Sequence, residues 1–254
     1  MKENKARVIA FYLPQYHPIP ENDKYWGKGF TEWTNVAKAK PLFRGHYQPH
    51  IPADLGFYDL RLPEVREAQA ELARDAGIEG FCYYHYWFGN GKMLLQKPFE
   101  EVLRLGKPDF PFCLCWANHD WTTKTWVKGS SMVNNTMIAQ QEYLGEQDDI
   151  KHFEYCLRAF KDHRYITIEG KPIFLIYDPL SFPNVKEFMN RWNFLAKKNN
   201  LKGIYFIGVT TGRQSSYKIV TNLGFDGVCH NRRWEAEAKA AGFRFVRRMQ
   251  SLLG

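Results

Sequence analysis

The sequence lacks several features that would assign a function at once. No apolar run in its 254 residues is long enough to cross a bilayer, and the charged residues 1–5 do not resemble a signal peptide. It contains no Walker loop, no nucleophile elbow and no HExxH motif, and no repeat or low-complexity tract divides it. We therefore expect a single cytoplasmic domain over residues 1–254, without stable membrane insertion.

Cysteine is scarce, and its placement excludes an obvious metal centre. Cys113 and Cys115 share one face of a predicted strand, but no second ligand pair with zinc spacing stands nearby. His46 and His50 have zinc-like spacing, yet Pro49 between them argues against a helix that presents both. We expect free thiols in a reducing compartment, no metal and no cofactor, with the buried cysteines being Cys82, Cys113, Cys115, Cys156 and Cys229.

The charge is basic but scattered, whereas aromatic residues are abundant. The net charge is +8, and only short pairs such as Arg232-Arg233 and Arg247-Arg248 stand together, which indicates a solvated surface and no nucleic-acid partner. Aromatic residues make up 16% of the chain, with 8 Trp, 14 Tyr and 19 Phe. That share exceeds what a core usually requires. Sugars are a natural partner, because their C–H faces pack on aromatic rings while their hydroxyls bind polar side chains.

Short apolar runs alternate with amphipathic stretches, which is typical of βα units around a parallel sheet. A doubly wound sheet would offer a glycine-rich turn after its first strand, but that position carries Leu13-Pro14-Gln15. We therefore predict a (β/α)8 TIM-barrel-type fold that is incomplete, with about six βα units, and one more helix at 243–253. The predicted strands are 8–13, 80–84, 112–116, 173–177, 204–209 and 227–230, and the main predicted helices are 63–76, 146–161, 185–198 and 217–223.

Polar and aromatic residues gather wherever a predicted strand ends, and long loops follow the first and third strands at 14–60 and 117–145. In barrel enzymes such loops build the active site at the carboxyl ends of the strands. Capping, turns and rim packing account for some of these residues, and Tyr83 and Tyr86 belong to the core as readily as to a site. The predicted saccharide-binding residues are Tyr16, His17, Trp33, Tyr84, His85, Trp116, Asn118, Trp121 and Tyr177.

Three carboxylates are candidates for acid or base chemistry on a glycosidic bond: Glu32, Asp120 and Asp178. Each has a simpler interpretation. Glu32 can cap a local turn, Asp120 can hydrogen-bond a sugar without transferring a proton, and Asp178 precedes Pro179 and can start a turn. The sequence pattern alone does not choose among them.

Several long motifs resemble the WbsX-like family, which is related to glycoside hydrolase family 99. They are FYLPQYHP at 11–18, WGKGFTEWTNV at 26–36, HYQPH at 46–50, GFCYYHYWF at 80–88 and CWAN at 115–118. The resemblance covers most of the chain. It implies a (β/α)8 barrel and work on glycans, often in surface-polysaccharide gene clusters; members are commonly named glycosyltransferases, although the fold relationship points to α-mannoside-type glycosidases.

The chain departs from the family pattern in two places. The family usually continues Trp-Ala-Asn with Glu-Asn-Trp, where this chain has His119-Asp120-Trp121. The family's last strands carry an acidic stretch with a Glu-x-x-Glu pair, which this sequence does not contain. The resemblance implies action on α-linked, mannose-type saccharides in polysaccharide or lipopolysaccharide O-antigen metabolism. The alternatives are a non-catalytic saccharide-binding remnant and a nucleotide-sugar-dependent glycosyltransferase, and a partner chain that completes the barrel is a further expectation.

Overall fold

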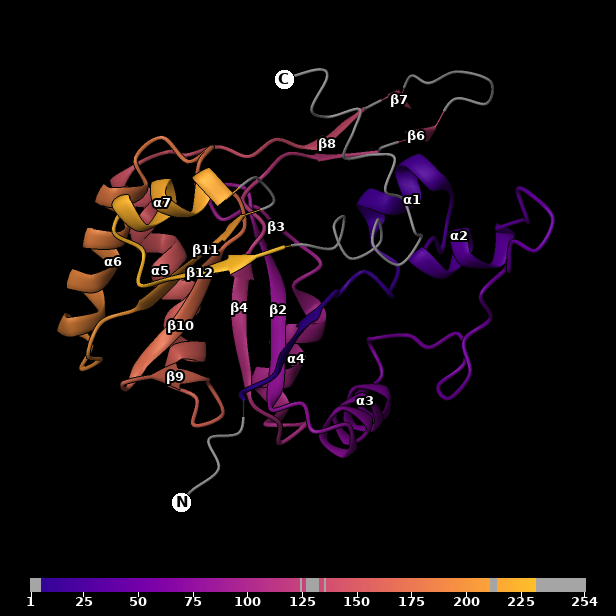
Figure 1. Cartoon of the computed structure of the whole chain (residues 1–254), viewed down its shortest axis with the longest axis horizontal. Coiled ribbons are helices and arrows are strands. Elements are labelled where there is room, and N and C mark those ends of the chain that lie inside the picture. Colours follow the sequence, from indigo (N-terminus) through magenta and orange to yellow (C-terminus); the bar gives the residue numbers. More distant parts are fainter. Residues whose placement is uncertain (1–5, 124, 127–132, 135, 211–213, 232–254) are drawn as a thin grey trace.

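Six parallel strands form a half-barrel, which confirms the predicted fold class and the incomplete count of βα units (Figure 1). The computed structural model describes residues 6–123, 125–126, 133–134, 136–210 and 214–231, so the helix predicted at 243–253 lies outside the described residues. The strands follow one another in chain order across the sheet. They are β1 (Ile9–Tyr12), β2 (Gly80–Trp87), β4 (Phe112–Trp116), β10 (Lys171–Ile176), β11 (Tyr205–Thr210) and β12 (Gly227–His230).

A helix connects each strand to the next, as expected for βα units. Local signals fit these helices, since α3 starts with Pro63 and α4 is followed by Gly106 in the left-handed region at φ 68°. Among the described residues, no helix combines the length and apolar character that crossing a bilayer requires. The connecting helices are α3 (Pro63–Asp75), α4 (Lys97–Leu105), α5 (Glu146–Phe160), α6 (Val185–Lys198) and α7 (Gln214–Asn222).

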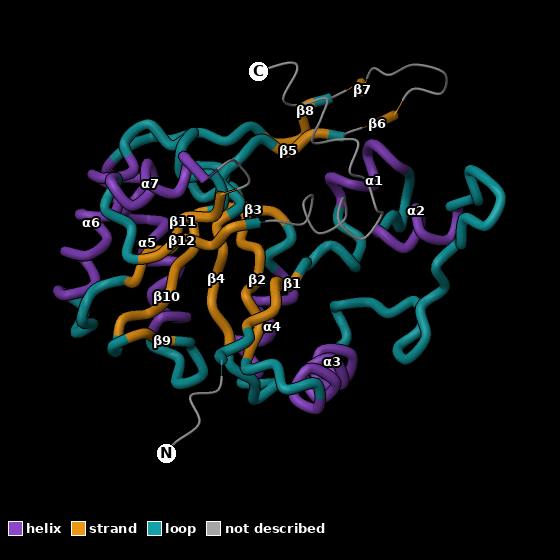
Figure 2. Tube along the Cα trace, in the orientation of Figure 1, coloured by secondary structure: helices purple, strands orange, loops and turns teal. Residues whose placement is uncertain are grey.

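The long loops contain short elements that the sequence pattern did not predict. Figure 2 shows the segments after β1 and β4 at the end of the sheet where the parallel strands finish. These segments are too short for a clear hydrophobic period, so only pairing and capping in three dimensions define them. They comprise α1 (Pro20–Trp26), α2 (Glu32–Lys38), and the strand pairs β5 (Trp121–Thr122) with β8 (Met137–Ala139) and β6 (Thr125–Trp126) with β7 (Val133–Asn134); β3 (Met93–Leu94) and β9 (Thr167–Ile168) pair with β2 and β10.

Strand β2 is longer than predicted, and this changes the environment of its last residues. It continues to Trp87 because β3 pairs with Tyr86 and Trp87. Successive side chains of a strand point to opposite faces. His85 therefore faces the helices, where its ring contacts α5, while Tyr84 faces the inside of the half-barrel and contacts the ring of Tyr177. The prediction that β2 ends at Tyr84 was wrong.

The core between the sheet and helices α5 and α6 is built largely of aromatic rings. Trp192 of α6 is fully buried, and its ring contacts those of Phe174, Phe188 and His152. Each such ring buries a large apolar area and prefers tilted or edge-to-face contacts. This layer fixes α5 and α6 against the sheet and so positions the loops that precede both helices.

Two histidines are buried in this aromatic layer and contact each other. The Nε2 atoms of His85 and His152 lie 2.8 Å apart. The ring of Trp87 stacks on His152 at 4.7 Å, and that of Tyr155 stacks on His85 at 5.5 Å. Burial lowers the pKa of His85 to about 3, and burial together with the neighbouring His85 lowers the pKa of His152. Both imidazoles are therefore neutral in the folded protein near pH 7.

We predict that this pair makes the fold sensitive to acid. Because both folded-state pKa values lie below the usual 6.5, the unfolded chain binds protons first as the pH falls. The stability that depends on neutral imidazoles is fully present above pH 6.5 and is lost between pH 6.5 and about 3. Urea unfolding across this range should show a shallower pH slope for His85→Gln than for the wild type. His163→Gln is the control, because His163 is 82% exposed; parallel slopes for wild type and His85→Gln would contradict the prediction.

Asn118 joins the ends of strands β4 and β10. Its side-chain Nδ2 donates to the backbone oxygen of Asp178 at 2.8 Å, and its Oδ1 accepts from the Asp178 N–H at 2.7 Å. Nδ2 also donates to the hydroxyl of Tyr143 at 3.0 Å, and that hydroxyl donates to the Asn118 backbone oxygen at 3.0 Å. Asn118 is only 1% exposed. Its amide therefore satisfies backbone groups that would otherwise be buried without partners.

We predict that Asn118→Ala lowers the free energy of unfolding by about 2 kcal/mol, because it leaves the partly buried N–H and carbonyl groups of Asp178 unpaired. Urea denaturation followed by near-ultraviolet circular dichroism measures the change. Asn35→Ala on the exposed side of α2 serves as the control and should stay within about 0.5 kcal/mol of wild type. An Asn118 variant as stable as the control would show that the loops do not depend on this amide.

Candidate functional site

The inner face of the half-barrel carries a partly exposed group of aromatic side chains. Phe11 of β1 stacks on Tyr84 of β2 with ring centroids 5.4 Å apart, and Tyr84 contacts Tyr177 at 5.9 Å. His119, directly after β4, adds its ring at 5.5 Å from Tyr177. Phe11 is 43% exposed, and the other three are half-buried. We call Phe11, Tyr84, His119 and Tyr177 the inner aromatic surface.

Glu32 lies close to two tyrosines at the edge of this region. It is the first residue of α2, behind the capping residue Thr31, whose hydroxyl accepts the Trp33 N–H. Burial raises the pKa of the Glu32 carboxyl. Burial and then the charge of Glu32 raise the pKa of Tyr16. Burial also raises the pKa of Tyr86 to about 12, with a smaller contribution from the Glu32 carboxylate. A partly buried carboxyl group with a raised pKa is the kind of group that serves in general acid or base catalysis.

The remaining aromatic residues of the β1 loop pack on one another. Tyr16 contacts Trp33 at 4.6 Å and Tyr58 at 5.4 Å, and Trp33 Nε1 donates to the Tyr58 backbone oxygen at 2.9 Å. Trp121 of β5 stacks on Tyr86 at 6.0 Å. Tyr16, Trp33 and Trp121 are half-buried, so each keeps some surface for a ligand while supporting the loop.

The other two candidate carboxylates hold loops in place. One oxygen of Asp120 accepts the backbone N–H of Gln141 at 2.7 Å, and Asp178 Oδ1 accepts the N–H of Ser181 at 3.3 Å. The Asp178 bond matches the turn-forming interpretation of that residue, whereas the Asp120 bond joins two distant parts of the loop after β4. Among the three predicted carboxylates, Glu32 combines partial burial with a raised pKa, which makes it the strongest candidate for acid or base chemistry.

Four predicted site residues lie away from the inner aromatic surface. Trp116 is 3% exposed and donates through Nε1 to the Trp87 backbone oxygen at 2.9 Å, so its ring has no open face for a sugar. His85 and Asn118 are buried in the roles described above. His17 is 1% exposed, and burial lowers its pKa to about 4. We therefore leave these four out of the proposed contact surface.

Two members of the inner aromatic surface were missed by the sequence interpretation. Phe11 is paired in register with Cys82, which places it on the inner face beside Tyr84. The alternation of side chains along β1 could have predicted that Phe11 faces inward, but only once the inner face of the sheet is known. His119 lies one residue beyond Asn118, and its position depends on the turn that the Asn118 amide holds.

One group of side chains among the described residues has the composition of a metal site. His85, His152 and Cys156 offer ligand atoms within 4.8 Å of one another, and all three are buried. The two Nε2 atoms are already at hydrogen-bond distance, and both imidazoles are stacked against aromatic rings. The direct hydrogen bond satisfies these nitrogens without an ion. The five cysteines are free thiols, four of them buried and Cys229 half-buried.

Comparisons with known proteins agree with this architecture. The model of the family described as glycosyltransferase WbsX matches residues 8–252. Two curated relatives, each described as uncharacterized protein WxcX from strains of Xanthomonas campestris pv. campestris, are 42% identical over 223 residues. These alignments cover 88% of this chain and 31% of each relative, so the chain spans less than a third of their length.

Solved structures share the fold at low sequence identity. A GH99 endo-alpha-mannosidase from Bacteroides thetaiotaomicron, in complex with BIS-TRIS-Propane, has a TM-score of 0.53 and 16% identity over 87% of this chain and 57% of its own. A glycoside hydrolase-like protein has a TM-score of 0.53 and 15% identity over 89% and 58% of the two chains. At these identities the likeness concerns the fold alone. The family match over residues 8–252 shows that the chain belongs to the glycosyltransferase WbsX family.

Proposed function

We propose that the protein binds and processes α-linked, mannose-type saccharides in polysaccharide or lipopolysaccharide O-antigen metabolism. The observation that carries this proposal is the inner aromatic surface with Glu32 nearby, at the end of the sheet where barrel enzymes hold their active sites. Family membership supports a carbohydrate ligand, and the shared fold of an endo-alpha-mannosidase supports the mannose-type substrate.

The chemistry of the surface suits a sugar chain. The rings of Tyr84 and Tyr177 offer apolar area to sugar C–H faces, and their hydroxyls can bind sugar hydroxyls. Gln15, whose Nε2 donates to the Tyr86 hydroxyl at 3.0 Å, adds an amide oxygen nearby. Glu32 supplies the proton-transferring group. Glycoside cleavage requires a second carboxyl group, which we place in the strands that would complete the barrel, because Asp120 and Asp178 hold loops.

A nucleotide-sugar-dependent transferase is the second candidate, favoured by the description of the family. A non-catalytic saccharide-binding remnant is the third, favoured by the half-barrel. Mass spectrometry of α-mannosides incubated with the protein distinguishes the three. Hydrolysis products without added nucleotide support the first, elongation only with a GDP- or UDP-sugar supports the second, and unchanged saccharide that still binds supports the third.

The partner expected to complete the barrel is part of this proposal. Strands β1 and β12 end the sheet of the described chain, so each leaves one backbone edge unpaired within it. A groove of about 330 Å³ lies between β1 and α3, lined by apolar residues that include Phe11, Leu13 and Leu72. Further strands and helices, from the same polypeptide or a partner chain, would cover this groove. The free thiols support the expected reducing, cytoplasmic location.

Loss of the aromatic rings should weaken saccharide binding. We predict that Tyr84→Ala and Tyr177→Ala each weaken binding of a mannose oligosaccharide at least tenfold, measured by isothermal titration calorimetry, because each removes a stacking face. Tyr84→Phe should keep most of the affinity, since the ring remains. Phe194→Ala, at a ring that is 68% exposed on α6, is the control and should bind like wild type. Equal affinity in all four variants would remove the inner aromatic surface from the binding site.

Glu32→Gln should abolish turnover while binding persists. We predict a loss of at least about a hundredfold in rate, the usual contribution of a general acid or base, with saccharide affinity changed less than threefold. Product formation is followed by mass spectrometry on the wild type and variant, each combined with the strands that complete the barrel and carry the second carboxyl group. Glu64→Gln is the matched control, because Glu64 is an exposed acidic residue in the first turn of α3. Turnover by the Glu32 variant at the wild-type rate would refute the assignment.

A further inference from the structure

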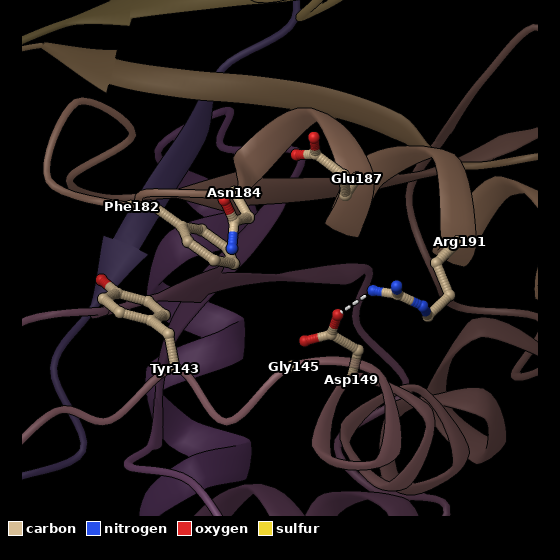
Figure 3. A pocket seen from close by; sticks show the side chains of 7 residues that line it. All are labelled: Tyr143, Gly145, Asp149, Phe182, Asn184, Glu187 and Arg191. Atoms are coloured by element: carbon tan, nitrogen blue, oxygen red, sulfur yellow. Dashed lines mark hydrogen bonds and ion pairs between the residues drawn. The ribbon is translucent and has the colours of Figure 1, made fainter.

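A second cavity lies on the helix-facing side of the same end of the sheet, apart from the inner aromatic surface. It has a volume of about 240 Å³ and opens between the starts of α5 and α6. Gly145 and Asn184, the residues that precede these two helices, contribute to its wall (Figure 3). We call it the helix-end pocket; its lining residues are Tyr143, Gly145, Asp149, Phe182, Asn184, Glu187 and Arg191.

An ion pair forms one wall of the helix-end pocket. Asp149 of α5 accepts a hydrogen bond from Arg191 of α6 through one carboxylate oxygen. Figure 3 shows the other oxygen turned away from Arg191 and toward the side of Tyr143. Within the described part of the chain, that second oxygen accepts no hydrogen bond from a side chain or backbone group. The Asp149 side chain is 12% exposed, so a fixed acceptor faces a partly desolvated space.

The opposite wall adds an amide and apolar ring surface. The side chain of Asn184 makes no capping hydrogen bond to α6, and Figure 3 places its amide across the space from Asp149. The rings of Tyr143 and Phe182 stack at 4.3 Å and border the same space. The Tyr143 hydroxyl is engaged with Asn118, so this ring is held in place by the loop between β4 and α5. A rigid aromatic border beside polar groups is an arrangement that recognises amphipathic ligands.

The charges of the helix-end pocket exclude several ligand classes. Asp149 and Glu187 supply two carboxylates against the single guanidinium of Arg191, so phosphate and nucleotide groups would be repelled. Hard divalent cations prefer six or more oxygen ligands, and a guanidinium and aromatic rings are unsuited to them. A neutral ring with adjacent hydroxyls fits, because one hydroxyl can donate to Asp149 while another accepts from Asn184 or Arg191.

The burial of Asp149 supports a ligand-binding role for this residue in addition to its ion pair with Arg191. Desolvation raises the pKa of Asp149 to about 6, although Arg191 opposes the shift. A carboxylate kept in a desolvated pocket costs stability even when paired. The volume lies below the range of roughly 300–1,000 Å³ for pockets that enclose drug-sized ligands, and so it suits a single ring.

We propose that the helix-end pocket is a second saccharide-binding site, which takes one neutral sugar ring through adjacent hydroxyls bound to Asp149, Asn184 and Arg191. The identity of the ligand as a sugar rests on the proposed function of the protein. The site itself is separate from the inner aromatic surface and requires no proton transfer by Glu32. It would bind one residue of a glycan outside the reacting position, and so add affinity without changing the chemistry.

Amide NMR of the full 254-residue chain tests this proposal with methyl α-mannoside and free mannose, glucose and galactose as probes. We expect one of these sugars, at millimolar concentration, to shift the amide signals of Gly145, Asn184 and Glu187. Asn184→Ala and Asp149→Asn should weaken the effect at least tenfold. Glu154→Gln, at an exposed acidic residue of α5, is the matched control and should change it less than twofold.

The same spectra separate this proposal from the proposed function. Shifts near Tyr84 and Tyr177 alone would overturn the helix-end site and leave the proposed function standing. Shifts at the helix-end amides that persist in Tyr84→Ala would support the second site independently. If the amide signals shift neither at the helix-end pocket nor near Tyr84 and Tyr177, the proposed helix-end site is overturned as well. Asn184→Ala removes an exposed side chain without breaking the ion pair, so it keeps the test valid if Asp149→Asn loses stability.

Discussion

The hydrogen bonds of the Asn118 amide are the constraint on which the functional end of the structure depends. Parallel strands end at the same edge of a sheet, and beyond that edge the ladder no longer joins the segments that leave β4 and β10. Asn118 joins them by binding both backbone groups of Asp178, and it also holds the Tyr143 hydroxyl. Tyr177 precedes Asp178 in the chain and belongs to the inner aromatic surface. Tyr143 borders the helix-end pocket. One buried amide thus positions residues of both proposed binding sites.

The two faces of β2 separate stability from binding. Tyr83, His85 and Trp87 point toward the helices and are buried among aromatic rings. Tyr84 points inward, where only half of it is covered. Aromatic residues of β2 that face the helices therefore stabilise the fold, whereas Tyr84, which faces inward, offers a stacking surface. The two kinds are adjacent in the sequence and have similar side chains. The buried pair of His85 and His152 lies on the helix-facing side of β2. We therefore expect it to affect the stability of the fold at acid pH and to take no part in catalysis.

The proton transfer proposed for Glu32 and the sugar binding proposed for the aromatic surface require different environments. The pKa of Glu32 is raised because its carboxyl group is partly buried. Tyr84 and Tyr177 must instead keep open area. The half-barrel satisfies both needs, since the long loop after β1 covers one part of the inner face and leaves the other exposed. Completion of the barrel would enclose this surface further and exclude water from it.

The sequence by itself determined the six βα units, because apolar runs, helix periodicity and the terminal Pro and Gly signals all agree on them. It also determined that aromatic and polar residues collect at the carboxyl ends of the strands. Only the tertiary structure decided which of them are available to a ligand. His85 and Trp116 were predicted as binding residues, yet strand alternation turns them toward the helices, whereas Phe11 turns inward. The face that a residue occupies depends on register and on where a strand ends. For β2 that end is set by pairing with β3, a contact between backbones that no local pattern in the sequence encodes.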